Sequence, residues 1–231
     1  MSQDIDYINI IAIIPARGGS KGIPGKNIKN FEGKPLISHS IEYAKDSKLI
    51  NEIYVTTDDN QIAHISKTAG AKIITRPAEL ATDTSTTESA IKHALNNIDK
   101  LPDIIVLLQP TSPLRPEKSL DIAINKFLND DCDSLLSLSP SNDFFWTIDS
   151  KKASPEYDFL NRKRRQDITE YEKKYFENGS IYIFTREHFE LTNNRLGGKI
   201  GYLIFSEEYG YEIDVPRDLI ILEQLSRELI K

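Results

Sequence analysis

The fold is decided by the stretch Ile8-Asn-Ile-Ile-Ala-Ile-Ile-Pro-Ala-Arg-Gly-Gly-Ser-Lys-Gly-Ile-Pro-Gly-Lys-Asn27. Its first half is rich in isoleucine, which is typical of a strand buried on both faces of a parallel sheet. After Pro15 the chain carries four glycines and three cations, Arg17, Lys21 and Lys26. Glycines let backbone N–H groups approach a ligand closely, and clustered cations attract several negative charges. We therefore interpret this loop as a candidate phosphate-binding loop at the carboxyl end of a first strand.

Two familiar phosphate-binding loops do not match this spacing. A dinucleotide-binding loop needs glycines at positions i, i+2 and i+5, and no three glycines of the loop satisfy that pattern. A P-loop, G-x-x-x-x-G-K-[ST], needs glycine and then serine or threonine where this chain has Ser20 and Asn27. On composition alone, a solvated glycine-rich turn remains the alternative.

Strand and helix patterns alternate downstream of the loop as far as residue 138. Strands are predicted at 52–57, 72–75, 103–108 and 134–138, and helices at 35–44, from Asp58–Asn60 to about Gly70, at 91–98 and from Pro116. Further strands are predicted at 180–184 and 200–205, and a closing helix at 216–230. Because this alternation builds right-handed βαβ units, we predict an α/β fold, a three-layer α/β/α domain around a mostly parallel sheet.

Residues 140–175 interrupt the alternation. They are polar, carry a basic run at Arg162–Arg165 and include the aromatic triplet Phe144–Trp146. We interpret them as an insertion within a single domain of residues 1–231 and not as a second core, and the aromatic side chains indicate a partner surface.

Composition narrows the classes of function. The net charge is −6, which does not favour a nucleic-acid-binding surface. The single cysteine, Cys132, cannot form an internal disulfide, and its aspartate neighbours disfavour a reactive thiolate. No apolar run approaches the 18 residues that a membrane span needs, and Met1–Asp6 lacks the charge pattern of a signal peptide. We expect a cytoplasmic protein.

The loop itself resembles the nucleotide-binding loop of the acylneuraminate cytidylyltransferases, the CMP-sialic acid synthetases. The resemblance implies that the CTP triphosphate and ribose are bound by Ala16, Arg17, Ser20, Lys21, Lys26 and Asn27. It further implies that Arg17 and Lys21 act in catalysis, because nucleotidyl transfer requires positive groups around the reacting phosphate and the departing pyrophosphate.

A second segment, Arg76-Pro-Ala-Glu-Leu-Ala-Thr-Asp83, has a structural and a functional interpretation. From the residues alone it is a loop before a helix that starts at Asp83, Thr84 or Ser85, with Glu88 completing a capping box from Ser85. It also resembles the segment R-P-x-x-L-A-x-D with which the family recognises cytosine. The resemblance implies that Arg76 contacts the base, with Ser85 close to it.

A third segment, Leu108-Gln-Pro-Thr-Ser-Pro-Leu-Arg115, follows a predicted buried strand. From the residues alone it is a proline-rich turn at the sheet edge where α/β proteins bind ligands. It is similar over almost its whole length to a family motif, which implies that Gln109 contacts the sugar acid, with Thr111 or Ser112 nearby. The related Kdo-activating enzymes typically carry Q-G-D-x-P here, and the absence of that pattern argues against Kdo.

The basic run and the later Asn178-Gly179 pair are, taken alone, a solvated face and a turn. The family, however, carries R-R-Q-D and N-G-x-I-Y at these places. The resemblance implies that Arg165 pairs with the substrate carboxylate through its planar guanidinium and that Asn178 contacts the substrate. Many members have arginine where this chain has Phe176, so Lys174 is a candidate to supply that contact.

The last segment, Tyr211-Glu-Ile-Asp-Val-Pro-Arg-Asp218, places Glu212 and Asp214 on one face of an extended chain. Two such carboxylates suit Mg²⁺ while leaving positions for phosphate and water. The family usually has D-x-D here, which implies that Asp214 is a catalytic metal ligand and makes Glu212 a conservative departure. The four histidines form no metal-binding pattern and are interpreted as structural.

The resemblance implies an enzyme that uses Mg²⁺ to transfer CMP from CTP to the anomeric hydroxyl of a sialic-acid-like nonulosonic acid, such as N-acetylneuraminic or legionaminic acid. It also implies a homodimer in which residues 140–175 reach the partner. The alternatives are a cytidylyltransferase for another ulosonic acid such as Kdo and a non-catalytic nucleotide-binding relative. All versions of the enzyme hypothesis require that the cations after the first strand and the acidic pair near residue 214 lie together.

Overall fold

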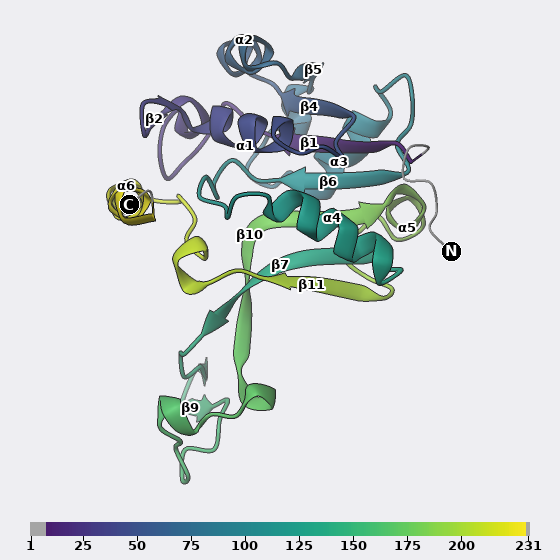
Figure 1. The fold of residues 1–231 in the computed structure, drawn as a ribbon. Helices are drawn as coiled ribbons and strands as arrows, with labels where there is room; N and C mark the ends of the chain where they lie inside the picture. The colour runs from purple at the N-terminus through teal and green to yellow at the C-terminus, as the bar shows by residue number, and fades with distance from the viewer. Residues whose placement is uncertain (1–7, 230–231) are drawn as a thin grey trace.

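The isoleucine-rich stretch forms β1 (Ile10–Pro15) inside a seven-stranded sheet in the computed structural model, which describes residues 8–229 (Figure 1). The strand order is β11-β7-β10-β6-β1-β4-β5, and every pair is parallel except those of β10 with β6 and β7. The prediction of a mostly parallel sheet is therefore confirmed. The other strands are β4 (Glu52–Thr57), β5 (Lys72–Thr75), β6 (Ile104–Leu108), β7 (Ser134–Ser141), β10 (Lys174–Thr185) and β11 (Ile200–Ile204).

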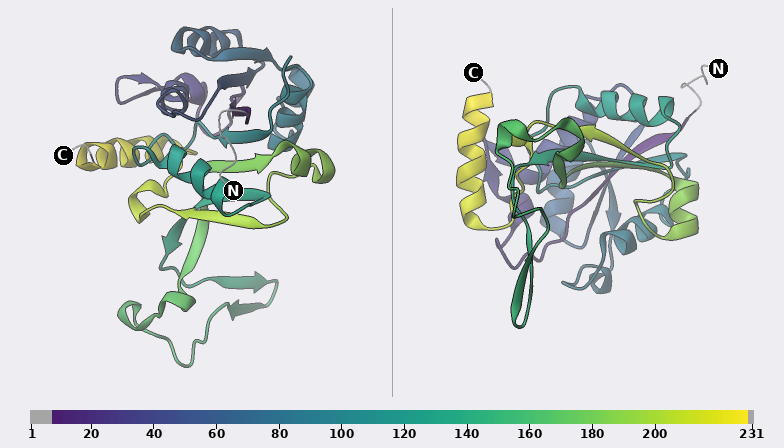
Figure 2. Two further views of the ribbon diagram at one scale, coloured as in Figure 1. Left: turned by 45° about the vertical axis from the view of Figure 1, so that its right-hand side comes forward. Right: turned by 90° about the horizontal axis from the view of Figure 1, so that it is seen from below.

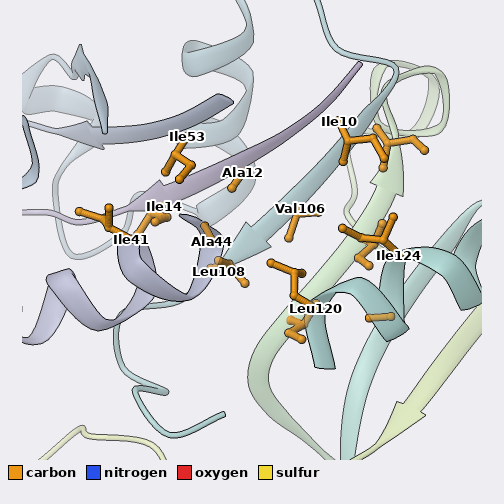
Figure 3. Close-up of a cluster of buried hydrophobic side chains, with 14 of the residues drawn as sticks. Ile10, Ala12, Ile14, Ile41, Ala44, Ile53, Val106, Leu108, Leu120 and Ile124 are labelled. Atoms are coloured by element: carbon orange, nitrogen blue, oxygen red, sulfur yellow. The ribbon is translucent and has the colours of Figure 1, made fainter. Parts of the chain in front are cut away.

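Helices cover both faces of this sheet. Ile10, Ala12 and Ile14 of β1 point into a core shared with three helices, α1 (Leu36–Lys45), α2 (Asn60–Ala69) and α4 (Ser119–Asn129) (Figure 3). Ile11 and Ile13 point the opposite way, into a core shared with α3 (Thr87–Leu95) and α5 (Arg186–Thr192). All five side chains are buried. The three-layer prediction is confirmed, because a strand buried on both faces needs an apolar layer on each side.

The predicted helix boundaries hold where the capping signal is strong. Asp59 caps α2 by accepting hydrogen bonds from the backbone of Gln61 and Ile62, and Gly70 ends the helix in the left-handed region at φ 103°. At the far end of the chain, α6 (Pro216–Leu229) starts at the predicted proline. The predicted last helical residue, Ile230, lies outside the described residues, as does Met1–Asp6.

Two predicted helix starts were wrong. The helix after β6 begins at Ser119 and not at Pro116, because Lys118 adopts a left-handed conformation and the Pro116 carbonyl accepts the Ser119 hydroxyl in a preceding turn. The helix α3 is capped by Thr86, whose side chain accepts the Ser89 backbone N–H. The expected capping box from Ser85 is therefore not formed.

The strand predicted at 180–184 is longer and antiparallel. It begins at Lys174, and its register against β7 shifts between Glu177 and Tyr182. The predicted turn at Asn178-Gly179 is consequently a bulge inside β10. The chain enters β10 by returning from the segment that follows β7, so it runs against both neighbouring strands.

The segment between β7 and β10 projects from the sheet (Figures 1 and 2). It contains a small hairpin of β8 (Trp146–Asp149) and β9 (Lys152–Pro155). We call residues 142–173 the extension. Its apolar side chains are unusually exposed, with Ile148 80% and Leu160 79% accessible. Among the described residues, no helix combines the length and apolarity needed to cross a bilayer.

The extension should be dispensable for folding, since both helical layers pack on the sheet without it. Ser141 pairs directly with Lys174, so residues 142–173 can be replaced by Asn-Gly, which favours a two-residue hairpin turn. We expect the shortened protein to keep the circular dichroism spectrum of the parent and a cooperative thermal transition. Loss of that transition would show that the extension is part of the folding unit.

Candidate functional site

The loop after β1 and the acidic segment before α6 meet in the folded chain. Lys26 Nζ lies 3.1 Å from Asp214 Oδ1 and donates to the Ile213 carbonyl at 3.0 Å. Gly22 lies so close that a Cβ there would come within 2.2 Å of the Asp214 carbonyl oxygen. Any side chain at residue 22 would push the two segments apart.

A small apolar cluster holds these segments together. Ile23 from the loop packs with Ile213 from the acidic segment, and Leu222 of α6 lies in the same cluster. Phe31 and Leu36 complete it from the short hairpin of β2 (Asn30–Phe31) and β3 (Lys34–Pro35) and from α1. All five side chains are buried, so the contact between Lys26 and Asp214 rests on packing as well as on charge.

The other two loop cations share one carboxylate. Arg17 lies 2.9 Å and Lys21 2.8 Å from the oxygens of Asp83, and Arg17 also donates to the Thr82 carbonyl at 2.6 Å. The hydrogen bond from Lys21, with the charge of Arg17 added, lowers the pKa of the Asp83 carboxyl. Arg17 and Lys21 therefore face the same point in space, where an anion can bind.

The backbone of the loop is held by polar contacts beneath it. The Gly18 N–H donates to Asp58 Oδ1 at 3.0 Å, and the Asn27 amide donates to the Arg17 carbonyl at 2.9 Å. Ala16 is buried and donates its N–H to the Thr56 carbonyl, and Ser20 lies half-buried farther along the same loop. Ala16 and Asn27 therefore shape the loop from below.

Arg76 is a buried arginine at this edge of the sheet, and two of its donors lack partners within residues 8–229. Its side chain is 6% exposed, and Nε and one terminal nitrogen form no hydrogen bond within the described chain. Burial lowers the pKa of the guanidinium, an effect that the nearby Asp58 opposes. Because unpaired buried donors are costly, this geometry favours a ligand that offers acceptor atoms. Ser85, by contrast, bonds to the Glu79 carbonyl and to Thr82 within its own loop.

Glu212 lies deeper than Asp214. Burial, with the nearby charge of Asp214 added, raises the pKa of its carboxyl to about 7, and Lys26 acts in the opposite direction. Its side chain and that of Gln109 both lie over the backbone of Gly179. The Thr111 hydroxyl is buried close to Glu212 and forms no hydrogen bond of good geometry with a described residue.

These side chains fit a divalent cation that prefers oxygen ligands. Asp214 offers a carboxylate that is 68% exposed, and the raised pKa of Glu212 marks a carboxyl group that a nearby cation would stabilise in its charged form. Over residues 8–229, no three His, Cys, Asp or Glu side chains form a metal cluster. Asp214 and Glu212 are thus the two carboxylates of this segment that could hold a divalent cation, with coordination positions left for phosphate and water.

Two side chains predicted to contact substrate are not exposed at this site. Asn178 is fully buried, and its amide is occupied by Ser137, Ser139 and the Ser180 backbone, so the prediction that its side chain contacts substrate is not supported by this geometry. Arg165 belongs to the extension, where it lines a cavity of about 570 Å³ together with Lys174. Cys132 is buried, which raises the pKa of its thiol, as expected for an unreactive cysteine.

The sequence interpretation missed two residues that organise the site. Asp83 was predicted as a possible helix start and as the end of the motif beginning at Arg76, although it is the partner of both Arg17 and Lys21. No role was predicted for Arg115, the last residue of the third segment. It donates to the carbonyls of Gln109 and Ser180 and lies over the Tyr43 ring. The signal in the sequence for this role was a single arginine at the end of an otherwise uncharged, proline-rich turn.

Solved structures with the same architecture define the class of fold. A CMP:2-keto-3-deoxy-manno-octonic acid synthetase complexed with CTP matches with a TM-score of 0.73 at 17% identity, covering 96% of this chain and 99% of that one. A 4-diphosphocytidyl-2C-methyl-D-erythritol synthase from Anaerococcus prevotii matches with a TM-score of 0.68 at 15% identity, covering 96% and 98%. The chain thus shares the α/β fold of these two proteins.

The sequence then places the chain within that class. The family described as Cytidylyltransferase matches residues 11–230, and the chain belongs to this family. It is 36% identical to an N-acylneuraminate cytidylyltransferase of Oncorhynchus mykiss over 94% of its length, and 33% identical to one of Escherichia coli O18:K1:H7 over 90%. In both cases the match covers 50% of the relative, so the chain spans about half the length of the curated relatives it matches.

The partly buried carboxyl of Glu212 should make the stability of the protein depend on pH. Because its pKa in the folded protein is raised to about 7 from 4.5, the folded state binds this proton more tightly than the unfolded state does. The stability that this bound proton contributes is fully present below pH 4.5 and is lost as the pH rises through 7. We expect Glu212→Gln to gain about 1–3 kcal/mol of unfolding free energy relative to the parent at pH 8, and progressively less towards pH 5.

Urea unfolding at several pH values in the presence of a chelator measures this difference, with the exposed Glu117→Gln as the control. A difference between parent and Glu212→Gln that stays constant from pH 5 to pH 8 would contradict the assignment.

Proposed function

We propose that this chain is a cytidylyltransferase that transfers CMP from CTP to the anomeric hydroxyl of a sialic-acid-like nonulosonic acid and releases pyrophosphate. The observation that carries the proposal is the junction of Lys26 with Asp214, beside Arg17 and Lys21. It puts cations for a triphosphate next to carboxylates for a metal ion. The likeness to N-acylneuraminate cytidylyltransferases supports the choice of acceptor.

The triphosphate binds at the loop after β1. Arg17 and Lys21 exchange the Asp83 carboxylate for phosphate oxygens, and Lys26 approaches from the side of Asp214. Positive groups fixed around the departing pyrophosphate stabilise the charge that develops there, without having to reorganise during the reaction. Ala16, Ser20 and Asn27 shape the loop that presents its backbone N–H groups to the nucleotide.

Arg76 binds the cytosine base. Its planar guanidinium offers a fork of N–H donors, which suits the two neighbouring acceptors of cytosine, O2 and N3. Uracil carries a hydrogen at N3 and would leave a donor facing a donor, so the same arginine selects CTP over UTP. Ser85 helps by holding the loop between Glu79 and Thr82 in place.

The residues of the acidic segment hold Mg²⁺. Asp214 and Glu212 would hold the ion, which would supply Lewis-acid chemistry by lowering the pKa of the acceptor hydroxyl and offsetting phosphate charge. Asp214 is exposed enough to take this ligand role directly. Glu212 is longer than the aspartate usual in the family and lies deeper, so it supports the site from beneath.

The sugar acid lies beside Gln109 and Thr111, at the carboxyl end of β6, and its carboxylate pairs with an arginine from a second copy of the chain. Arg165 sits in the extension, which projects from its own sheet (Figure 1). The exposed apolar side chains of the extension, and of Ile200, Tyr202 and Ile204 on β11, give a second copy a surface to cover. We therefore infer a homodimer in which Arg165 and Lys174 serve the partner's site. We also propose that the protein acts in the cytoplasm, as its sequence pattern predicts.

The alternatives are less well supported. The likeness to the CMP:2-keto-3-deoxy-manno-octonic acid synthetase concerns the fold, and the turn after β6 carries Gln109-Pro110 in place of the Q-G-D-x-P segment of the Kdo-activating enzymes. A non-catalytic nucleotide-binding protein has no need of an acidic pair beside the cations.

Pyrophosphate release from CTP tests the reaction, with N-acetylneuraminic, legionaminic and pseudaminic acids as acceptors. We expect release with at least one acid, and a loss of 100-fold or more in Arg17→Ala and Asp214→Ala because each removes charge stabilisation at the reacting phosphate, worth about 3 kcal/mol. Lys34→Ala is the matched control, since Lys34 pairs with Glu42 away from the loop. CTP binding without release for any acid would favour the non-catalytic alternative, and full activity of Asp214→Ala would exclude its metal role.

Mixing two inactive variants tests the dimer. Arg165→Ala lacks the residue that serves the partner's site, and Asp214→Ala lacks a residue of its own site. A mixed dimer contains one site with both residues intact, so we expect activity to rise to about a quarter to a half of the parent after subunit exchange. No recovery in a mixture shown to contain mixed dimers would place Arg165 in its own chain's site.

A further inference from the structure

The bulge in β10 lies directly under the two side chains that the proposed function assigns to metal and sugar acid. Gly179 has a φ of +64°, and a Cβ built there would lie 1.7 Å from Glu212 Oε1 and 3.0 Å from Gln109 Oε1. Real Cβ atoms do not approach an oxygen to 1.7 Å. Glu212 and Gln109 therefore lie on bare backbone, and their positions depend on the absence of a side chain at residue 179.

A buried polar network fixes this bulge from below. Asn178 accepts hydrogen bonds from the Ser137 hydroxyl at 2.6 Å and from the Ser180 N–H at 3.2 Å, and donates to Ser139 at 3.0 Å. The Asn178 carbonyl accepts the Ser112 hydroxyl at 3.2 Å. These hydrogen bonds engage the side chains of Asn178, Ser137 and Ser139 in a low-dielectric interior, where such bonds are strong and hold the bulge in place.

Arg115 links the bulge to the end of β6. One terminal nitrogen donates to the Gln109 carbonyl at 2.8 Å and to the Ser180 carbonyl at 3.2 Å, while the other donates to the Ser40 hydroxyl at 3.1 Å. The guanidinium also lies over the Tyr43 ring, 5.1 Å from its centroid. The backbone of Gln109 and the bulge on which the Gln109 side chain lies are thus held by the same planar guanidinium.

We propose that Asn178, Gly179 and Arg115 form a buried platform that positions Glu212 and Gln109 in the active site, and that Glu212 and Gly179 are matched in size. On this proposal, which rests on the proposed function, Asn178 is a positioning residue and does not touch substrate. A methyl group at residue 179 displaces the Glu212 carboxylate, and shortening Glu212 by one methylene, about 1.5 Å, makes room again.

The central test is Gly179→Ala, alone and combined with Glu212→Asp. We expect Gly179→Ala to lower the melting temperature and to weaken Mn²⁺ binding, measured by electron paramagnetic resonance, at least tenfold. We expect the KM for the sugar acid to rise by a similar factor while calorimetric affinity for CTP without metal is unchanged. Adding Glu212→Asp to Gly179→Ala should restore most of the stability and Mn²⁺ affinity that Gly179→Ala loses. The double variant should then be close to Glu212→Asp alone in both properties. Gly33→Ala is the control, because Gly33 has a similar φ of +84° but open space around it.

Parent-like Mn²⁺ binding and melting in Gly179→Ala, or losses equal to those of Gly33→Ala, would overturn the platform. So would a folded double variant with no recovery. Asn178→Ala is then added to Gly179→Ala. No further change in Mn²⁺ affinity or in the KM for the sugar acid supports one shared platform. Multiplied changes would show that Asn178 acts separately on substrate. If the parent releases no pyrophosphate with any acid, the proposed function fails, but recovery of the melting temperature by Glu212→Asp still decides the size match.

Discussion

The structure depends on one short contact between distant parts of the chain, the approach of Lys26 to Asp214 and the Ile213 carbonyl. It is possible because Gly22 has no side chain where the acidic segment passes, and because Ile23 and Ile213 are buried in a common apolar cluster. Coulomb attraction between partly exposed charges is weak on its own. The burial of Ile23 and Ile213 keeps Lys26 and Asp214 close to each other. These two charges in turn limit which ligands can bind beside them.

Local charge placement reconciles the net charge of −6 with the polyanionic substrate that the proposed function requires. Arg17, Lys21 and Lys26 lie in one loop, and each cation is paired with a carboxylate. Ion pairs between exposed groups can be exchanged at low cost. A triphosphate can therefore replace Asp83 without leaving buried charge unpaired. Arg76 differs, since its buried donors have no internal partner to give up.

Features that depend on neighbouring residues were predictable from the sequence, whereas features that depend on distant contacts were not. The cap at Asp59, the left-handed Gly70 and the start of α6 at Pro216 were all predictable, because each depends on a few neighbouring residues. The bulge at Asn178 was not, since a turn and a bulge share the Asn-Gly pair and only the serines of β7 distinguish them. The thirty or so residues of the extension carried no pattern from which their projection could be predicted.

From the sequence alone came the buried first strand, the alternation that builds a parallel sheet, the cationic loop and the motifs that indicate a cytidylyltransferase. These features are encoded in local spacing and in residue type. Only the tertiary structure decided that Asp83 neutralises two loop cations, that Arg115 joins β6 to the bulge, and that Glu212 lies on bare backbone at Gly179. Such contacts join residues far apart in the chain, and their partners are set by how sheet strands and loops pack and not by any spacing along the sequence.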